Sequence, residues 1–416
     1  MLARVPGARV KAYPAAEVTR IAGTEEAPES GGLTRGDVEA IWGAVESLYA
    51  TGLHPAIGFC LRRRGHVMLD RTIGHRRGNS PQHGEEVERV VASPEDLFCL
   101  FSASKAITGM VVHLLDDRGL LHLDDAVAWH IPEFGQGNKE HITIRHVLTH
   151  RAGVPNIPEK YLTLDILRDN ARIVRLLCEA EATWYPGRQL AYHPLTGGYI
   201  LGELVRRVTG RDIRTFLAEE ILEPLGFKHC NYGVAPEEVD QVAEHAWTGL
   251  PVAPPWSWLV KRALGVSYHD AVRFSNMDDF KTAVIPAGNV MATPNEACRF
   301  YELLRQHGTL DGVKIFEPRT IMRAIAEQTY LEFDMTLGVP MRYAMGFFLG
   351  DRVLSVYGPN TTKAFGHLGF TVVNAWADPE REISVSVMTT GKPLVTPGQF
   401  YFWNVGRVIS ERCANR

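Results

Sequence analysis

Ser102 and Lys105 form the first pair in this chain whose residue types and spacing suit nucleophilic catalysis. They stand in the segment 98–105, FCLFSASK, and Lys105 is the one lysine of the sequence with a serine three residues before it. Residues three apart lie on one face of a helix, so the amine can reach the hydroxyl. Because a serine hydroxyl is a weak nucleophile without such help, the pair predicts attack by Ser102 on a carbonyl carbon. A helix cap followed by a surface lysine is the alternative.

A tyrosine in a second segment, 184–194, WYPGRQLAYHP, is the candidate partner of that pair. A Pro-Gly turn precedes Tyr192, and a helical pattern follows from Thr196 to Gly210. A nearby cation favours the ionised form of a phenol, whose ordinary pKa is about 10. Tyr192 beside a lysine is therefore predicted to act as a base. An interfacial tyrosine with no catalytic role is the alternative.

The third segment, 365–370, has the sequence FGHLGF and leads toward a strand pattern. Gly369 permits close approach of the backbone, so we expect the amides of Ser102 and Phe370 to be two oxyanion donors. His367 has two open interpretations, a hydrogen bond to substrate or packing within a strand.

The elements that must position these residues can be read from capping and periodicity. Thr34 and Asp37 predict the start of an amphipathic helix that runs to Tyr49, and the segments 56–61 and 66–73 predict a hairpin. Helical patterns dominate residues 97–280, and residues 1–32 are typical of an N-terminal arm. Strand patterns return at 343–349, 352–357, 371–377 and 383–388, with a closing helix at 398–412. We expect the early and late strands to share one sheet.

Composition excludes several classes of function. The chain has 416 residues, of which 45% are hydrophobic, so it is expected to fold and bury a large core. It carries 44 Lys and Arg against 48 Asp and Glu, a balance that argues against a nucleic-acid partner. Neither a signal peptide nor a membrane-spanning helix is predicted, and six widely spaced cysteines favour thiols in a reducing compartment. A cytoplasmic protein is expected.

Four further motifs could indicate catalysis, metal binding or substrate contact. His146 and His150 have helical spacing within a group of five histidines, but no Glu follows His146 as zinc proteases require, so no metal is expected. The segment 265–269, GVSYH, lacks the second glycine of a hydrolase elbow, which argues against Ser267. The segment 390–392, TGK, is interpreted as ending in a surface lysine. The segment 251–258, PVAPPWSW, with Trp256 and Trp258, is either a packed loop or a substrate-pocket wall.

Taken in this order, the three segments resemble the serine β-lactamase and penicillin-binding-protein superfamily, and most closely its family VIII carboxylesterases. Further similar segments are 142–154, 286–289, 293–294 and 308–312, and the resemblance covers about residues 34–400. It implies an α/β (α+β) fold with an antiparallel sheet flanked by helices. The α/β domain would comprise 33–96 and 281–416, and a helical domain, 97–280, would be inserted with the active-site cleft between them. Lys105 and Tyr192 would share proton transfer, the amides of Ser102 and Phe370 would hold the oxyanion, and water would resolve an acyl-enzyme on Ser102.

Two departures from the pattern narrow the expected substrate. Lactamases carry Tyr-x-Asn where this chain has Tyr192, His193 and Pro194, and they carry Lys-Thr-Gly where it has His367, Leu368 and Gly369. Leu368 cannot hydrogen-bond the carboxylate that those residues receive. The sequence therefore predicts a cofactor-free carboxylesterase for small, short- to medium-chain esters. An acyltransferase, a β-lactamase or D-aminopeptidase-type hydrolase, and a non-catalytic binding protein remain alternatives, and the oligomeric state is open.

Overall fold

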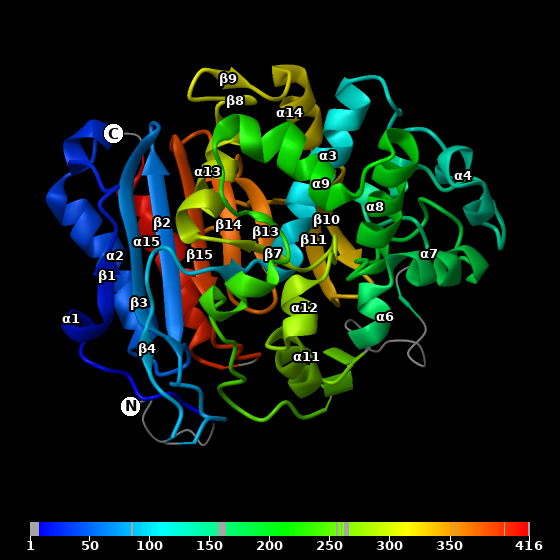
Figure 1. Ribbon diagram of the computed structural model, residues 1–416. Helices are drawn as coiled ribbons and strands as arrows, with labels where there is room; N and C mark the ends of the chain where they lie inside the picture. Colours follow the sequence, from blue (N-terminus) through cyan, green and yellow to red (C-terminus); the bar gives the residue numbers. More distant parts are fainter. Residues whose placement is uncertain are drawn as a thin grey trace.

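One large antiparallel sheet takes strands from both ends of the chain (Figure 1). The computed structural model describes residues 8–84, 86–154, 156–157, 164–254, 257–258, 260–261, 266–353, 355–394 and 396–414. Strand β15 pairs with β2 from Ile57 opposite Thr389 to Arg63 opposite Ile383, so the early and late strands share one sheet as predicted. In order across the sheet the strands are β1 (Thr19–Ile21), β3 (His66–Arg77), β2 (Ala56–Arg63), β15 (Ile383–Thr389), β14 (Val373–Asp378), β13 (Phe365–Gly369), β12 (Phe348–Leu349), β11 (Val339–Tyr343) and β10 (Thr329–Asp334), and β4 (Val90–Val91) pairs with β3.

Both faces of the central strands are buried. Along β15, Val385 and Val387 belong to the core beneath α2 (Arg35–Tyr49) and α15 (Gln399–Arg412). The alternate residue Ser386 donates a hydrogen bond to the Pro294 carbonyl of α13 (Pro294–Arg305), on the opposite face. This alternation, with successive side chains on opposite faces, places the sheet between two helical layers. The mixed α/β architecture is the one predicted.

The elements expected near the N-terminus form as predicted. Thr34 and Asp37 form a reciprocal capping box at the start of α2, which satisfies two backbone donors of the first turn. The expected hairpin is β2 and β3, which turn at Arg64 and Gly65. The segment expected as an arm lies along the sheet over its described part, because β1 pairs with the edge of β3 and α1 (Ala15–Val18) precedes it.

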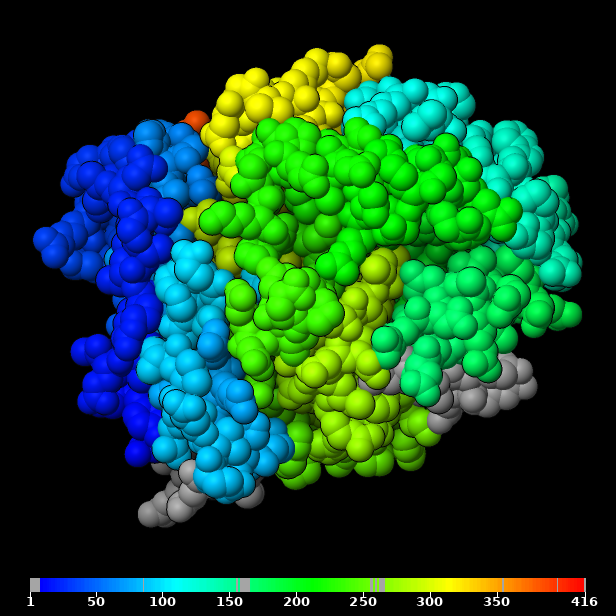
Figure 2. Space-filling model, in the orientation of Figure 1, coloured from blue at the N-terminus to red at the C-terminus, as the bar shows by residue number. Residues whose placement is uncertain are grey.

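The remaining helices lie on the other face of the sheet and past one of its ends, on the right in Figure 1. Helix α3 (Ser104–Asp117) is at the centre of this layer and packs against α8 (Thr196–Thr209). On the face in Figure 2, green and yellow-green segments from the middle of the sequence cover the centre of the molecule. The other helices are α4 (Val127–His130), α5 (Ile144–Leu148), α6 (Leu164–Arg168), α7 (Asn170–Glu179), α9 (Ile213–Leu217), α11 (Tyr268–Ser275), α12 (Asp278–Thr282) and α14 (Pro318–Ala324).

The predictions of a strand at 343–349 and at 352–357 were wrong. The run 343–349 divides into β11 and β12, because Gly346 adopts a φ of 97° in the turn between them. The described part of 352–357 is a loop, in which the Asp351 carboxylate accepts a hydrogen bond from the Val353 amide. Such a side-chain turn competes with strand pairing. The segment 365–369, by contrast, is itself the strand β13, which pairs with β14.

Two global features bear on the expected cellular setting. Within the described ranges, no helix combines the length and apolar character needed to cross a bilayer. All six cysteines are buried and unbridged.

Candidate active site

Ser102 lies at the entrance of α3, where a small sheet and a strained residue position it. Strand β5 (Phe98–Cys99) pairs with β7 (Val290–Ala292), and β7 also pairs with β6 (Asn231–Tyr232). A short 3-10 turn, Phe101–Ala103, then leads into α3. Phe101 has a φ of 47°, a left-handed conformation that is unfavourable for a bulky residue. Strain of this kind persists where the surroundings hold it, and here it immediately precedes the candidate nucleophile.

Lys105 lies one helical turn from Ser102, as the spacing predicts. A hydrogen bond of 3.2 Å joins Lys105 Nζ and Ser102 Oγ, and Nζ also donates to the Ala287 carbonyl at 2.9 Å. The side chain is buried, and burial holds the pKa of Lys105 well below its ordinary value. A neutral amine at hydrogen-bonding distance is suited to accept the hydroxyl proton.

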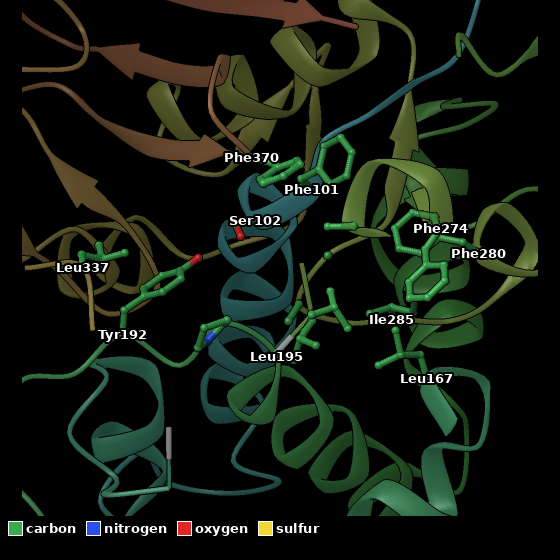
Figure 3. A pocket seen from close by; sticks show the side chains of 15 residues that line it. Phe101, Ser102, Leu167, Tyr192, Leu195, Phe274, Phe280, Ile285, Leu337 and Phe370 are labelled. Carbon is green, nitrogen blue, oxygen red and sulfur yellow. The ribbon is translucent and has the colours of Figure 1, made fainter. Parts of the chain in front are cut away.

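Tyr192 joins this pair from the segment before α8. Its phenol oxygen points toward Ser102 (Figure 3), and Lys105 Nζ lies 4.9 Å from the centre of the ring. The prediction that the pKa of Tyr192 is lowered was wrong. Burial raises that pKa, and the nearby Ser102 hydroxyl opposes the rise only in part. The neutral phenol is therefore the favoured form, because desolvation penalises the phenolate.

Asp334, at the end of β10, fixes the backbone beneath Tyr192. Its two carboxylate oxygens accept hydrogen bonds from the Tyr192 amide at 3.1 and 3.0 Å. It also accepts from the Tyr343 hydroxyl at 3.0 Å and from the amides of Thr336 and Leu337. Asp334 was not predicted as a site residue. It stands 142 positions from Tyr192 in the sequence, and no local pattern indicates the contact.

Gly369 brings the end of β13 against the chain that leads to Ser102. A Cβ at this position would lie 2.2 Å from the Leu100 carbonyl oxygen, a backbone atom that cannot move aside easily. The rings of Phe370 and Phe101 lie 5.4 Å apart, and both residues line the same pocket as Ser102. The structure thus brings the two predicted oxyanion-donor residues to one place.

His367 is buried on β13 behind the tyrosine and does not line the pocket. Its ring lies 4.1 Å from that of Phe348 and 6.2 Å from that of Tyr192. Burial, followed by the charge of Lys105, lowers the pKa of His367 to about 3. Of the two interpretations left open, this position fits the packed strand residue.

The pocket beside Ser102 is almost entirely apolar. Its free space is about 180 Å³, many times the roughly 10–15 Å³ that one water molecule needs. Ser102 and Tyr192 are the lining residues with polar side chains, and apolar side chains surround them, most of them on the side of Leu195, Ile285 and Phe280 (Figure 3). No charged side chain is among its lining residues in the described part of the chain, which are Phe101, Ser102, Leu167, Tyr192, Pro194, Leu195, Val266, Ala271, Phe274, Phe280, Ile285, Ala287, Gly288, Leu337 and Phe370. These walls were missed because they come from distant segments without a shared pattern.

Of the two tryptophans proposed as a pocket wall, Trp258 is 69% exposed and is not among the lining residues of the pocket, and Trp256 lies outside the described residues. Ser267 caps α11 through hydrogen bonds with Asp270, a structural role.

Lys392 was wrongly expected at the surface. It is fully buried, donates to the Thr389 carbonyl at 2.7 Å, and lies 4.7 Å from the centre of the Phe101 ring.

The predicted histidine pair has structural contacts. His146 Nδ1 accepts from the Thr143 amide, and His150 Nδ1 accepts from the His193 amide. Over the described ranges, no group of three or more histidine, cysteine or acidic residues is arranged to hold a metal ion.

Comparison with known proteins shows which family the chain resembles in sequence and structure. The Beta-lactamase family model matches residues 44–406. A relative, Esterase/beta-lactamase LipL of Mycobacterium tuberculosis, is 28% identical over 331 residues, which cover 76% of this chain and 74% of that protein. Among solved structures, a penicillin-binding protein homologue from Caulobacter crescentus is 27% identical with a TM-score of 0.78, covering 92% of this chain and 99% of its own. A family VIII carboxylesterase is 23% identical with a TM-score of 0.77, with the same coverage of both chains. These structures share the fold described above.

Proposed function

We propose that this chain, which belongs to the beta-lactamase family of serine hydrolases, is a carboxylesterase that cleaves uncharged esters of short to medium chain length through an acyl-enzyme on Ser102. The observation that carries the proposal is the buried amine of Lys105, 3.2 Å from Ser102 Oγ at the mouth of an apolar pocket. The relative LipL, whose name joins esterase and beta-lactamase, supports ester hydrolysis as an activity within the family.

In the acylation step, Lys105 Nζ accepts the hydroxyl proton as Ser102 Oγ forms a bond to the ester carbonyl carbon. The carbonyl oxygen takes the negative charge and receives hydrogen bonds from the amides of Ser102 and Phe370. The bond to the alcohol oxygen then breaks. Tyr192 donates its phenol proton to that oxygen and regains a proton from the Lys105 ammonium. The raised pKa of Tyr192 and the lowered pKa of Lys105 both favour this neutral starting pair.

Water resolves the acyl-enzyme by the same groups. A water molecule loses a proton toward Lys105 and Tyr192 while its oxygen attacks the acyl carbon. The bond to Ser102 Oγ breaks, and the proton returns to that oxygen. The carboxylic acid leaves and the resting hydroxyl is restored.

The pocket favours uncharged substrates. A carboxylate transferred from water to an apolar wall without a partner is strongly disfavoured. The lining residues supply no cation, and Leu368 supplies no hydrogen bond where lactamases place a polar side chain. Esters whose acyl and alcohol groups are both apolar fit this wall better than β-lactams or D-alanyl peptides do.

Steady-state hydrolysis of p-nitrophenyl esters with acyl chains of two to twelve carbons tests the proposal. We expect wild type to prefer the shorter half of the series, and Ser102→Ala to lose at least about 1000-fold in kcat. Ser267→Ala, which removes an exposed capping hydroxyl, serves as the matched control and should retain activity. Ester hydrolysis that survives in Ser102→Ala would overturn the assignment.

A further inference from the structure

A second, much smaller cavity is lined by Lys105, which does not line the substrate pocket. Lys105, Thr108, His150 and His193 are the polar residues that line it, and the other lining residues are Val147, Leu148, Gly197, Gly198, Leu201 and Gly346. Its free space is about 20 Å³. Since one water molecule needs roughly 10–15 Å³, the cavity has room for about one water molecule and is too small for a larger ligand.

His193 is the unusual group in this cavity. The residue is completely buried, yet neither ring nitrogen forms a regular hydrogen bond with the described residues. Burial lowers the pKa of His193 to about 4, and the nearby Ala191 backbone opposes the shift only in part. A buried polar group without a partner is costly, and ordered water is the usual remedy. The unpartnered ring nitrogens of His193 line a cavity with room for about one water molecule, which makes it a candidate site for an ordered water.

The surroundings of Lys105 explain why a water there matters. Acylation converts the amine into an ammonium with three N–H donors, and the Ala287 carbonyl accepts one of them. The titratable groups facing the amine are Tyr192 and the imidazoles of His150, His193 and His367, with Asp334 behind Tyr192. Burial favours the neutral form of all four rings. The ammonium must therefore be stabilised by dipoles.

We propose that a single buried water bridges Lys105 Nζ and the ring of His193, and that His193 is a positioning residue for the catalytic base. The water oxygen accepts a hydrogen bond from the ammonium, and one water O–H donates to a ring nitrogen of His193. The proton stays on Lys105, and no covalent bond forms or breaks in the bridge. This inference rests on the proposed role of Lys105 in ester hydrolysis.

Two substitutions separate the bridge from simple packing. His193→Phe keeps a flat buried ring but removes the acceptor, whereas His193→Gln keeps a carbonyl that can accept from the water. We expect His193→Phe to lower kcat/KM by about 10- to 100-fold. It should also move the acid limb of the pH profile of kcat/KM to lower pH by about half to one unit, because the ammonium loses a partner and the pKa of Lys105 falls. His193→Gln should recover most of both effects.

The matched control is His75→Phe. His75 is also a buried histidine with an unpartnered Nδ1, but it lies on β3 beside the Tyr13 ring. This variant should leave both the rate and the acid limb unchanged. Equal losses in His193→Phe and His193→Gln with an unmoved acid limb would indicate packing alone and overturn the proposal.

A high-resolution crystal structure of the wild-type protein tests the water directly and needs no activity. The expected result is one ordered water within hydrogen-bonding distance of Lys105 Nζ and a His193 ring nitrogen. A dry cavity, or a water that does not contact His193, would overturn the proposal. If wild type shows no hydrolysis that depends on Ser102, the proposed function fails, while the crystallographic result still decides whether the bridge exists.

Discussion

Lys105 Nζ lies 4.9 Å from the centre of the Tyr192 ring, and burial acts on the two groups in opposite directions along the pKa scale. It lowers the pKa of the amine and raises that of the phenol. Burial therefore favours the neutral form of both groups, which together offer one phenol proton and one available nitrogen lone pair. In the proposed mechanism, Lys105 is accordingly the base and Tyr192 the proton donor to the leaving group.

Removing the phenol oxygen tests the second of these roles. Tyr192→Phe should lower kcat by about 100- to 10,000-fold with a smaller change in KM, because the ring still lines the pocket. Steady-state kinetics on a p-nitrophenyl ester and on an ester with a poorer leaving group measure the effect, which should be larger on the latter. Tyr301→Phe removes a buried hydroxyl from α13 on another part of the protein and is the control. Near wild-type turnover in Tyr192→Phe would remove the tyrosine from the mechanism.

Gly369 should tolerate no side chain. Gly369→Ala places a Cβ 2.2 Å from the Leu100 carbonyl oxygen, so β13 or the turn before Ser102 must shift. We expect the free energy of unfolding to fall by about 1–3 kcal/mol and kcat to fall with it. Gly43→Ala is the control, because a Cβ there meets nothing within 4 Å in the middle of α2 and should stabilise the helix by about 0.5–1 kcal/mol. Denaturant unfolding and ester hydrolysis of both variants decide the point; a fully active and stable Gly369→Ala would contradict the close approach.

Substrate charge should matter more than substrate size. The p-nitrophenyl ester of butyric acid and the mono-p-nitrophenyl ester of succinic acid differ mainly by a methyl group in place of a carboxylate. Because the pocket lining offers no cation, we expect kcat/KM for the butyrate to be higher by about 100-fold or more. Nitrocefin, which also carries a carboxylate, should be a poor substrate. A succinate ester or nitrocefin that matches the butyrate would show that the apolar wall does not set the specificity.

Lys392 should make stability depend on pH. Burial lowers its pKa to about 7 in the folded protein, against 10.5 for an exposed lysine. Between these values the unfolded chain binds a proton that the folded chain does not, so the contribution of Lys392 to the free energy of unfolding rises with pH, by at most about 1.4 kcal/mol per unit. Lys392→Met should therefore be more stable than wild type at pH 7, and the difference should shrink toward pH 10. Denaturant unfolding at pH 7, 8.5 and 10 measures it; a difference that does not change with pH would contradict the buried amine.

Local patterns predicted the parts of the site that a few residues determine. The helical spacing alone brings Lys105 to Ser102, and Thr34 with Asp37 defines the start of α2 by a capping box. Alternation along the first and last strands predicted a shared sheet, since both strands needed buried neighbours. The family resemblance predicted that Tyr192 would join the pair, which periodicity alone left open.

Tertiary contacts explain what the sequence could not predict. Lys392 follows polar residues that are typical of a surface turn, but the bridge between Gly391 and Ala246 and the packing of Leu53 against Gly391 enclose it. The sign of the Tyr192 pKa shift was wrong for the same reason, because the depth of burial outweighs a nearby amine that is itself neutral. The division into two domains and the cellular compartment stay predictions.

Covalent labelling tests the central claim most directly, because it reports the nucleophile itself. The wild-type protein is treated with a fluorophosphonate, digested, and the modified peptide is sequenced by mass spectrometry, with Ser102→Ala treated in parallel. We expect a single stoichiometric adduct on Ser102 in wild type, loss of ester hydrolysis in step with labelling, and no adduct in Ser102→Ala. An adduct on another residue, or complete inactivation with Ser102 unmodified, would contradict it.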